Sequence, residues 1–247
     1  MIKDGVQEKY TEKLAEGIEK VAKAIHPRPV VVRFSDLKTN EYRNLEGGKE
    51  YELEEKNPMI GWRGASRYIS EEYNEVFRLE CRAIKRLREK WNNIWVMIPF
   101  VRTVWEARKC LEILKEEGLR RREDFRVWLM AEVPSFAFII DEFNKLPIDG
   151  YSIGSNDLCQ FVLGVDRDST TLHKLGYFDE RDPAVMKAME MIVRGAKRSD
   201  KTCSICGESV SNYAKVASYL LGLGIDSVSV SPDAVLKTRD LLRSLKA

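Results

Sequence analysis

The stretch FRVWLMAEVPSFAFIIDEFNKLPIDGYSIG, residues 125–154, contains a complete strand–helix–strand unit. Its first nine and last five residues are mainly apolar runs of strand length, a pattern typical of strands buried on both faces of a sheet. Residues 134–146, which lie between the two runs, are expected to form a helix. Two strands joined in this way pair in parallel through a right-handed crossover. The stretch therefore predicts an α/β fold built on a parallel sheet.

The same alternation runs through the rest of the chain. Strands are expected at residues 29–34, 94–100, 125–133, 150–154, 202–207 and 225–231. Helices are expected at residues 6–25, 66–90, 104–117, 134–146, 183–198, 212–222 and 232–245. One long irregular insertion, residues 36–64, follows the first strand, and loops of that length are usually functional or mobile. The alternation fits an open doubly wound sheet or a TIM (β/α)8-type barrel and does not choose between them.

The composition excludes several classes of protein. The 247 residues suit one domain, and 41 Lys and Arg against 39 Asp and Glu give a net charge of +2, which makes no case for nucleic-acid binding. No apolar run approaches the roughly 18 to 20 residues of a membrane span. The first ten residues lack the pattern of a signal peptide, and five cysteines fit no disulfide framework. We therefore expect a cytoplasmic protein that binds neither nucleic acid nor a membrane.

Polar residues capable of chemistry follow the predicted strands. They are Arg33, Arg63, Arg102, Glu132, Asn156, Asp157, Cys206 and Ser231. The carboxyl ends of the strands meet at one edge in a parallel α/β fold, so these residues are expected to form one site. Carboxylate oxygens suit Mg²⁺, and guanidinium groups bind carboxylate or phosphate through paired donors. The pattern predicts a small anionic substrate that binds together with Mg²⁺.

Each of these residues also has an ordinary structural interpretation. Glu132 suits a helix start, and Asn156 or Asp157 suits a helix N-cap. Arg33 could form a structural ion pair, and Cys206 could be an inert buried thiol. The C-x-x-C motif that ends at Cys206 has neither the second cysteine pair nor the nearby histidine that a zinc site needs. The prediction of a site therefore depends on the common location of these residues.

Seven segments carry a resemblance to a known family. In chain order they are VVVRFSDLKTNEYRNLEGG, NPMIGWRGASRY, VMIPFVRT, MAEVPS, SIGSNDLCQFVLGVDRDS, SICGES and GIDSVSVSPDAVLKTR. Together they resemble the C-terminal PEP-binding barrel of the PEP-utilising enzyme family, in the form found in phosphoenolpyruvate synthases (pyruvate, water dikinases). The resemblance extends from about residue 28 to residue 240. It implies a TIM (β/α)8-type barrel that, with six strands expected here, lacks the first two.

The resemblance implies a role for each site residue. Arg33 and Arg63 match arginines that grip the phosphate and carboxylate of phosphoenolpyruvate, and Arg167 matches a further arginine of the site, with a catalytic role. The remaining matches are the Mg²⁺ ligands Glu132 and Asp157, the substrate-binding amide Asn156, and Cys206, the acid/base at the substrate methyl carbon. Gly154 and Ser155 would permit close approach of the backbone to the substrate. The implied cofactor is Mg²⁺, with Mn²⁺ as a substitute, and the implied ligands are pyruvate and phosphoenolpyruvate.

The family's other domains have no counterpart in these residues. Family members carry an ATP-binding domain and a phosphohistidine domain, whereas His26 and His173 are the only histidines here, and neither lies in such a motif. We therefore expect residues 1–247 to be one N-terminally incomplete barrel domain whose partner domains are supplied elsewhere. The family's barrel commonly carries subunit contacts, so a homo-oligomer is expected as well.

The leading functional interpretation is the PEP/pyruvate-binding catalytic domain of a phosphotransferase. It would take part in Mg²⁺-dependent phosphoryl transfer between a phosphohistidine and pyruvate, although the chain alone is not expected to complete the ATP-dependent reaction. One alternative is a non-catalytic barrel remnant or oligomerisation module, since an open sheet edge invites pairing. Another is a lyase that cleaves a carbon–carbon bond on a related barrel. The phosphate-gripping arginines and the ICGE thiol argue against a lyase.

Overall fold

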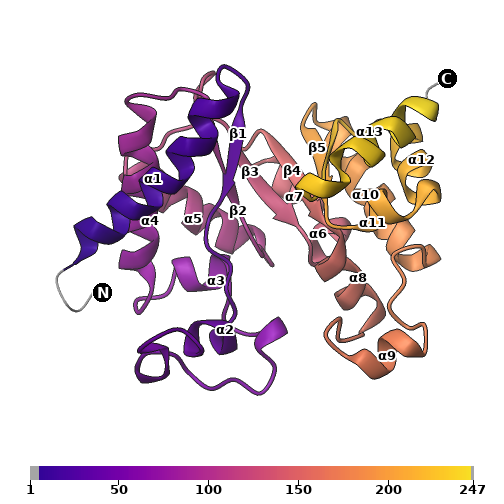
Figure 1. Ribbon diagram of the computed structural model, residues 1–247, viewed down its shortest axis with the longest axis horizontal. Coiled ribbons are helices and arrows are strands. Elements are labelled where there is room, and N and C mark those ends of the chain that lie inside the picture. The colour runs from indigo at the N-terminus through magenta and orange to yellow at the C-terminus, as the bar shows by residue number, and fades with distance from the viewer. Residues whose placement is uncertain (1–5, 246–247) are drawn as a thin grey trace. The chain divides into compact units, whose positions relative to one another are not determined.

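Six strands form one sheet in residues 6–245, the part of the chain that the computed structural model describes (Figure 1). They are β1 Val30–Arg33, β2 Ile94–Ile98, β3 Val127–Ala131, β4 Gly150–Gly154, β5 Thr202–Cys206 and β6 Ser227–Ser229. The strands are neighbours in sequence order, and the pairs β1–β2, β4–β5 and β5–β6 are parallel. A doubly wound sheet reverses its strand order at a switch point, whereas this sheet does not. The prediction of a TIM-type α/β fold with six of the eight strands is confirmed.

The chain divides into two compact units, residues 1–128 and residues 129–247. We call them the N-terminal unit and the C-terminal unit. The expected single domain extends over both units, and the assignment of residues 1–247 to one domain stays a prediction.

The N-terminal unit packs helices around the first strands. Its helices are α1 Gln7–Ile25, α2 Thr39–Arg43, α3 Ala65–Tyr68, α4 Asn74–Arg88 and α5 Val104–Glu116, with the 3-10 turns η1 Gly48–Glu50 and η2 Pro58–Ile60. α1 lies against α4 (Figure 1), and α4 buries Phe77 and Ile84 completely or almost completely. α5 begins with a capping box, in which the backbone N of Glu106 donates to Thr103 Oγ1 at 3.1 Å and the backbone N of Thr103 donates to Glu106 Oε2 at 3.2 Å.

The insertion between β1 and α3 is more regular than expected, since it contains α2, η1 and η2. The helix expected at residues 66–90 is in turn divided into α3 and α4. Asn74, the first residue of α4, donates from Nδ2 to the carbonyl oxygen of Tyr68 at 2.8 Å. This side chain satisfies a carbonyl at the end of α3, so the chain can leave the helix and begin the next one.

The C-terminal unit surrounds β4 and β5 with short helices. They are α6 Pro134–Phe138, α7 Ile140–Asn144, α8 Ser155–Leu163, α9 Thr170–Lys174, α10 Pro183–Arg198, α11 Ser209–Asn212, α12 Ala214–Gly222 and α13 Val235–Ser244, with the 3-10 turn η3 Pro232–Ala234. α10 packs on α6, α7 and α8, and a Cβ added at Gly195 would lie 3.1 Å from Ile140 Cγ1 and closer still to its Cγ2. The glycine therefore permits the close approach of α10 to α7.

Two helical predictions in this unit differ from the structure. The helix expected at residues 134–146 is broken at Ile139, whose ψ of 30° is not helical, and α8 and α9 were not expected as helices. The strands at the ends of the sheet also differ from the expected buried pattern. β4 is buried throughout, but residues 30–32 of β1 are only half-buried and Ser227 and Ser229 of β6 are exposed. Within residues 6–245, β1 and β6 are the edge strands of the sheet, so each pairs with a strand on one side only.

Candidate active site

The C-terminal unit brings three predicted site residues to the ends of neighbouring strands. Glu132 follows β3 directly, Gly154 ends β4, and Cys206 ends β5 as the register partner of Gly154. The Glu132 side chain is almost completely buried against Gly154, because a Cβ added at position 154 would lie 2.8 Å from Glu132 Cβ and closer still to Glu132 Oε2. Only glycine fits there without a shift, so a carboxylate, a bare stretch of backbone and a thiol lie close together.

The first turn of α8 supplies the next group of predicted residues. Asp157 is 6% exposed, and its Oδ1 lies 3.4 Å from Nη1 of Arg167. The backbone N of Arg167 donates to Gln160 Oε1 at 2.9 Å, which holds the loop after α8 against the helix. Asn156 is half-buried, whereas the Ser155 hydroxyl is completely buried and has no hydrogen-bond partner. The structure therefore joins Asp157 to Arg167 and encloses Ser155 in the protein.

The turn after Cys206 packs on this helix start. The Cys206 thiol is half-buried and donates to the carbonyl oxygen of Ile153 at 3.5 Å. Gly207 has a φ of +115°, and a Cβ there would lie 3.3 Å from Asn156 Oδ1 and closer than 3.0 Å to Ser155 Oγ. Both the backbone conformation and the close approach require glycine. The turn thus fixes the position of Cys206 relative to Ser155 and Asn156.

Glu180 is a buried acid that the sequence reasoning missed. It is 5% exposed, and its Oε1 has no hydrogen-bond partner. Burial raises the pKa of Glu180, the carboxylates of Glu208 and Asp179 raise it further, and the nearby Ser155 hydroxyl lowers it. The Ser155 contact is a loose one, because neither its hydroxyl nor Glu180 Oε1 meets hydrogen-bond geometry. Glu180 lies in a charged segment, FDERDP, and nothing in this segment distinguishes a buried glutamate from a solvent-exposed one.

The N-terminal unit holds Arg63 in a closed ion pair. Arg63 Nε donates to Asp36 Oδ1 at 3.2 Å, and Nη2 donates to Asp36 Oδ2 at 2.7 Å. The side chains of Arg63 and Asp36 are 3% and 2% exposed. Asp36 was not among the predicted site residues, although its place three residues after the strand-end Arg33 is a signal that could have found it. The arginine predicted to bind the substrate is thus oriented by a carboxylate that the sequence reasoning missed.

Arg33 and Arg102, the other predicted site residues of the N-terminal unit, are less buried than Arg63. Arg33 ends β1 and is exposed. Arg102 Nη1 donates to Ser66 Oγ at 3.2 Å, and Nη2 donates to the carbonyl oxygens of Ile60, at 3.2 Å, and Gly61. Burial lowers the pKa of Arg102, and the Glu106 carboxylate partly opposes this shift. Arg102 therefore fastens the segment that precedes Arg63.

The C-x-x-C motif, Cys203 to Cys206, lies within β5. Cys203 is completely buried within β5, and no group of three or more His, Cys, Asp or Glu side chains that could hold a metal ion occurs among residues 6–245. Glu132 and Asp157 provide two hard oxygen donors, and Mg²⁺ is commonly held by one or two carboxylates while waters and substrate oxygens complete its coordination. Gly154 places backbone without a side chain against the Glu132 carboxylate, which is 1% exposed. The donor chemistry fits Mg²⁺ or Mn²⁺.

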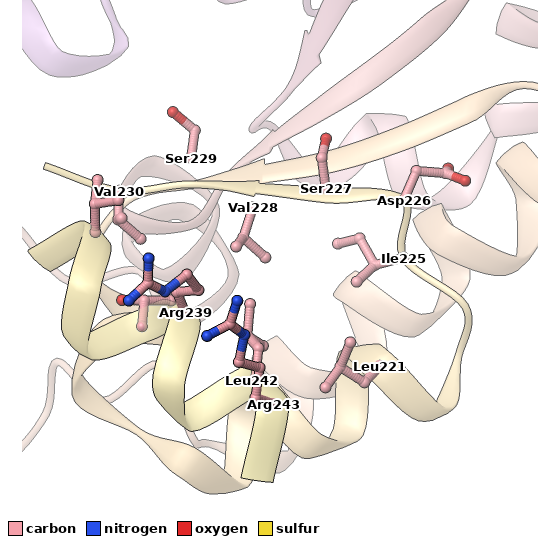
Figure 2. A pocket seen from close by; sticks show the side chains of 12 residues that line it. Leu221, Ile225, Asp226, Ser227, Val228, Ser229, Val230, Arg239, Leu242 and Arg243 are labelled. Carbon is pink, nitrogen blue, oxygen red and sulfur yellow. The ribbon is translucent and has the colours of Figure 1, made fainter. Parts of the chain in front are cut away.

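A hollow of about 550 Å³ lies elsewhere in the C-terminal unit, between β6 and α13. Figure 2 shows Val228 pointing into it together with Leu221 and Leu242, while Ser227 and Ser229 point away. None of the residues with an implied role lines this hollow. Ser231, which also follows the sixth strand, precedes η3 and is exposed. The predicted site is therefore a set of strand ends and not this groove.

The fold and the strand ends define a class of protein, a TIM-type α/β domain with carboxylates, a thiol and paired arginines. The family model described as PEP-utilising enzyme, PEP-binding domain, matches residues 1–247. The chain belongs to this family, as the resemblance predicted.

Curated relatives agree with this assignment. The chain is 57% identical over 248 residues to a probable phosphoenolpyruvate synthase of Staphylothermus marinus, and 57% identical over 249 residues to the phosphoenolpyruvate synthase of Aeropyrum pernix. Both matches cover 100% of this chain and 30% of the relative, so the chain spans about 30% of the length of these relatives. Since phosphoenolpyruvate synthase is a pyruvate, water dikinase, the family is one of phosphotransferase enzymes.

A distant solved structure shares the fold. A magnesium/glyoxylate complex of Haloferax volcanii malate synthase matches with a TM-score of 0.58 and 13% identity, over 95% of this chain and 61% of that chain. Identity this low supports the barrel architecture alone. In residues 6–245 no helix is both long and apolar enough to cross a membrane.

Proposed function

We propose that this domain binds phosphoenolpyruvate and pyruvate with Mg²⁺ and takes part in phosphoryl transfer between a phosphohistidine and pyruvate. The observation that carries the proposal is the contact of Glu132 with Gly154, whose register partner is Cys206. This arrangement gathers a hard oxygen ligand, a stretch of backbone without a side chain and a thiol, and Asp157 follows three residues after Gly154. A small oxygen-rich substrate with a carbon that exchanges a proton needs these three kinds of group.

The chemical type of each side chain suggests its role in the proposed reaction. Glu132 and Asp157 would hold Mg²⁺, which when bound supplies positive charge to the substrate oxygens. Arg33, Arg63 and Arg167 would bind anionic groups of the substrate, and the Asn156 amide would donate to a substrate oxygen. Gly154 and Ser155 would let the substrate approach the backbone. Cys206 would move a proton to or from the methyl carbon of pyruvate.

The rest of the reaction would come from outside these residues. Only 30% of the length of the relatives is spanned here, and neither His26 nor His173 lies in a phosphocarrier motif. ATP-binding and phosphohistidine domains elsewhere would supply the phosphoryl group. The half-reaction that this chain could perform alone is proton exchange at the methyl group of pyruvate.

The test is Mg²⁺-dependent exchange of pyruvate methyl protons with deuterated water, followed by NMR. We expect the chain to catalyse this exchange and Cys206→Ala to slow it by roughly 10²- to 10⁴-fold, the loss typical of a general acid/base. Cys203→Ala is the matched control, because that thiol lies three residues away and is completely buried. Oxalate, which has no methyl group, should bind Cys206→Ala about as well as the parent. Equal loss of exchange in both variants would contradict the role of Cys206.

A second candidate function is an assembly module without catalysis, and the exposed edge strand β6 favours it. Edge strands present unpaired backbone groups to other chains. A chain that associates but neither exchanges pyruvate protons nor binds oxalate with Mg²⁺ would support this candidate. The oligomeric state stays a prediction under both candidates.

A further inference from the structure

Two buried arginine–carboxylate pairs lie close together in the sequence of the N-terminal unit. Asp36 accepts from Nε and Nη2 of Arg63 at 3.2 and 2.7 Å. Glu52 accepts from Nη1 and Nη2 of Arg67 at 2.9 and 2.5 Å. The four side chains are between 2% and 10% exposed. Because the two pairs share this chemistry and burial, each can serve as the control for the other.

The surroundings of the two guanidinium groups are different. Arg67 is enclosed by aromatic rings, with Cζ at 4.1 Å from the ring centre of Trp62, 4.4 Å from that of Tyr73 and 4.5 Å from that of Tyr42. These contacts indicate a structural role for Arg67, which holds the insertion in place through Tyr42, Glu52 and Trp62. The Arg63 Cζ lies 3.9 Å from the ring centre of Phe100, and Arg63 Nη1 donates to the carbonyl oxygen of Met59 at 3.4 Å.

Phe100 holds an unusual backbone conformation. Its φ is +49°, in the left-handed region that bulky residues rarely occupy. Gly64 explains how the conformation is held, because a Cβ there would lie 2.6 Å from Phe100 Cβ and 2.7 Å from the carbonyl oxygen of Pro99. The same carbonyl accepts from the backbone N of Ala65 at 3.2 Å. The segment that carries Arg63 is thus locked onto the end of β2.

This conformation places one ring under two arginines. The Phe100 ring centre is 3.9 Å from Cζ of Arg63 and 4.5 Å from Cζ of Arg102. A residue held in a strained conformation needs over-determined surroundings, and such residues are concentrated at functional sites. The Phe100 ring covers one face of the Arg63 guanidinium, and Asp36 accepts hydrogen bonds along the Nε–Nη2 edge of the same group. The two contacts together fix the plane of the guanidinium and its rotation within that plane.

We propose that Asp36 and Phe100 are positioning residues that hold the Arg63 guanidinium in a preset orientation for an anionic substrate group. The proposal rests on the proposed function, because it takes Arg63 as a substrate-binding residue. Asp36 acts through the edge of the guanidinium and Phe100 acts through its face. An anion would meet an arginine that is already oriented, so little side-chain freedom is lost on binding.

The affinity of an Asp36→Asn variant for phosphoenolpyruvate should change in opposite directions under the two possible roles of Asp36, as a positioning residue or as a negative charge alone. Asp36→Asn removes a negative charge but keeps a side chain of the same shape. If Asp36 only weakened the positive potential, its removal would tighten the binding of phosphoenolpyruvate. If Asp36 positions Arg63, the affinity should fall, by about the 10- to 100-fold seen when partners behind metal ligands are removed. Glu52→Gln is the control, because it damages a matched buried pair and should leave the affinity of the folded protein unchanged.

Phe100 gives an independent variant. Phe100→Leu keeps an apolar side chain but removes the ring face, and we expect it to weaken phosphoenolpyruvate binding several-fold, in line with a cation–π contact. Phe100→Tyr keeps the face and should restore the parent affinity. Rescue by the aromatic residue is a result that a role in simple space filling would not give.

The experiment measures two properties of the 247-residue chain and these variants. Calorimetric titration with phosphoenolpyruvate and Mg²⁺ gives the affinity, and hydrogen exchange of the Arg63 Nε–H, followed by NMR, gives the orientation without any ligand. We expect slow exchange in the parent and Glu52→Gln and fast exchange in Asp36→Asn. Unchanged exchange in Asp36→Asn, or an affinity that rises, would overturn the proposal. A parent chain that exchanges as expected but binds no phosphoenolpyruvate would instead count against the proposed function.

Discussion

The two units differ in how individual buried carboxyl groups are satisfied. In the N-terminal unit, Arg63 and Arg67 are each closed on a carboxylate by two hydrogen bonds. In the C-terminal unit, Oε1 of the buried Glu180 carboxyl has no hydrogen-bond partner. A closed pair is already stabilised before any ligand arrives, whereas a buried oxygen without a partner carries an unrecovered desolvation cost. We infer that substitution in the Arg67–Glu52 pair acts mainly on stability, whereas substitution at Gly154, beside Glu132, acts on ligand binding.

The largest effect is expected from breaking the caged pair. Arg67→Ala removes the cation from three aromatic rings and leaves Glu52, 10% exposed, without its partner. Removal of one member of a buried pair typically costs about 3–5 kcal/mol. Urea unfolding should show a loss of this size. The control is Arg86→Ala, which breaks a surface pair with Glu8 and should cost about 0–1 kcal/mol. Similar losses in the two variants would remove the contrast between closed and surface pairs.

The second effect should appear in ligand binding. Gly154→Ala introduces a Cβ that would lie 2.8 Å from Glu132 Cβ and 3.2 Å from Met130 Cε. The Glu132 carboxylate must then move, and we expect Mn²⁺-dependent oxalate binding to weaken by about 100-fold, as for a misplaced metal ligand. Calorimetric titration measures the affinity. Gly222→Ala is the control, since a Cβ there meets no atom within 4 Å. Parent-like affinity in Gly154→Ala would show that Glu132 is not a ligand.

The strands were predictable because their signal is local. Each predicted strand lies within a few residues of the observed one, since a buried parallel strand is an unbroken apolar run and needs no distant partner to be recognised. The family segments likewise located Glu132, Asp157 and Cys206, and the structure brings Glu132 and Cys206 to Gly154, in the turn before Asp157.

The pairings were not predictable because they join distant or irregular segments. Asp36 and Arg63 are 27 residues apart across the insertion, and no periodicity connects them. The pKa of Glu180 is shifted by Ser155 of α8 and by Glu208 of the loop after β5. Both residues come near Glu180 only through tertiary packing. α8 was missed because its opening residues, Ser155 to Asp157, also have the composition of a ligand-binding turn. Polar residues at a strand end can begin a helix or bind a ligand, and sequence spacing alone does not distinguish these two roles.

A smaller effect is expected from the turn after Cys206. Gly207→Ala forces a non-glycine residue to a φ of +115° and places its Cβ closer than 3.0 Å to Ser155 Oγ. The conformational part should cost about 1–3 kcal/mol in the free energy of unfolding. Ser155→Ala removes a hydroxyl that has no partner, so it should be nearly neutral alone and should recover the steric part in the double variant. A double-mutant cycle by urea unfolding measures both parts, and strict additivity would mean that the two residues are not in contact.

The smallest effect compares one buried acid from each unit. Glu80 accepts from the backbone N of Ser35 at 3.1 Å and from the Tyr10 hydroxyl at 3.3 Å, whereas Oε1 of Glu180 has no partner. Burial raises the pKa of both carboxyls, and only Glu80 has hydrogen bonds from two donors that oppose the shift. A glutamine at position 80 can present only one oxygen to these two donors, so Glu80→Gln should cost about 1 kcal/mol at neutral pH.

The glutamine substitution at Glu180 should have the opposite sign. A carboxyl whose pKa is raised on folding binds more protons in the folded state, so the parent loses stability as the pH rises from about 4.3, the ordinary glutamate value, through the raised value. Glu180→Gln lacks this titration and has no hydrogen bond at Oε1 to lose. Its free energy of unfolding should equal the parent's in acid and exceed it at neutral pH, by about 1.4 kcal/mol for each unit of the pKa shift. Urea unfolding from pH 4 to pH 8 measures the difference. A Glu180→Gln variant that is less stable than the parent at neutral pH would mean that the carboxylate has a donor after all, and the contrast between the two units would not extend to their buried acids.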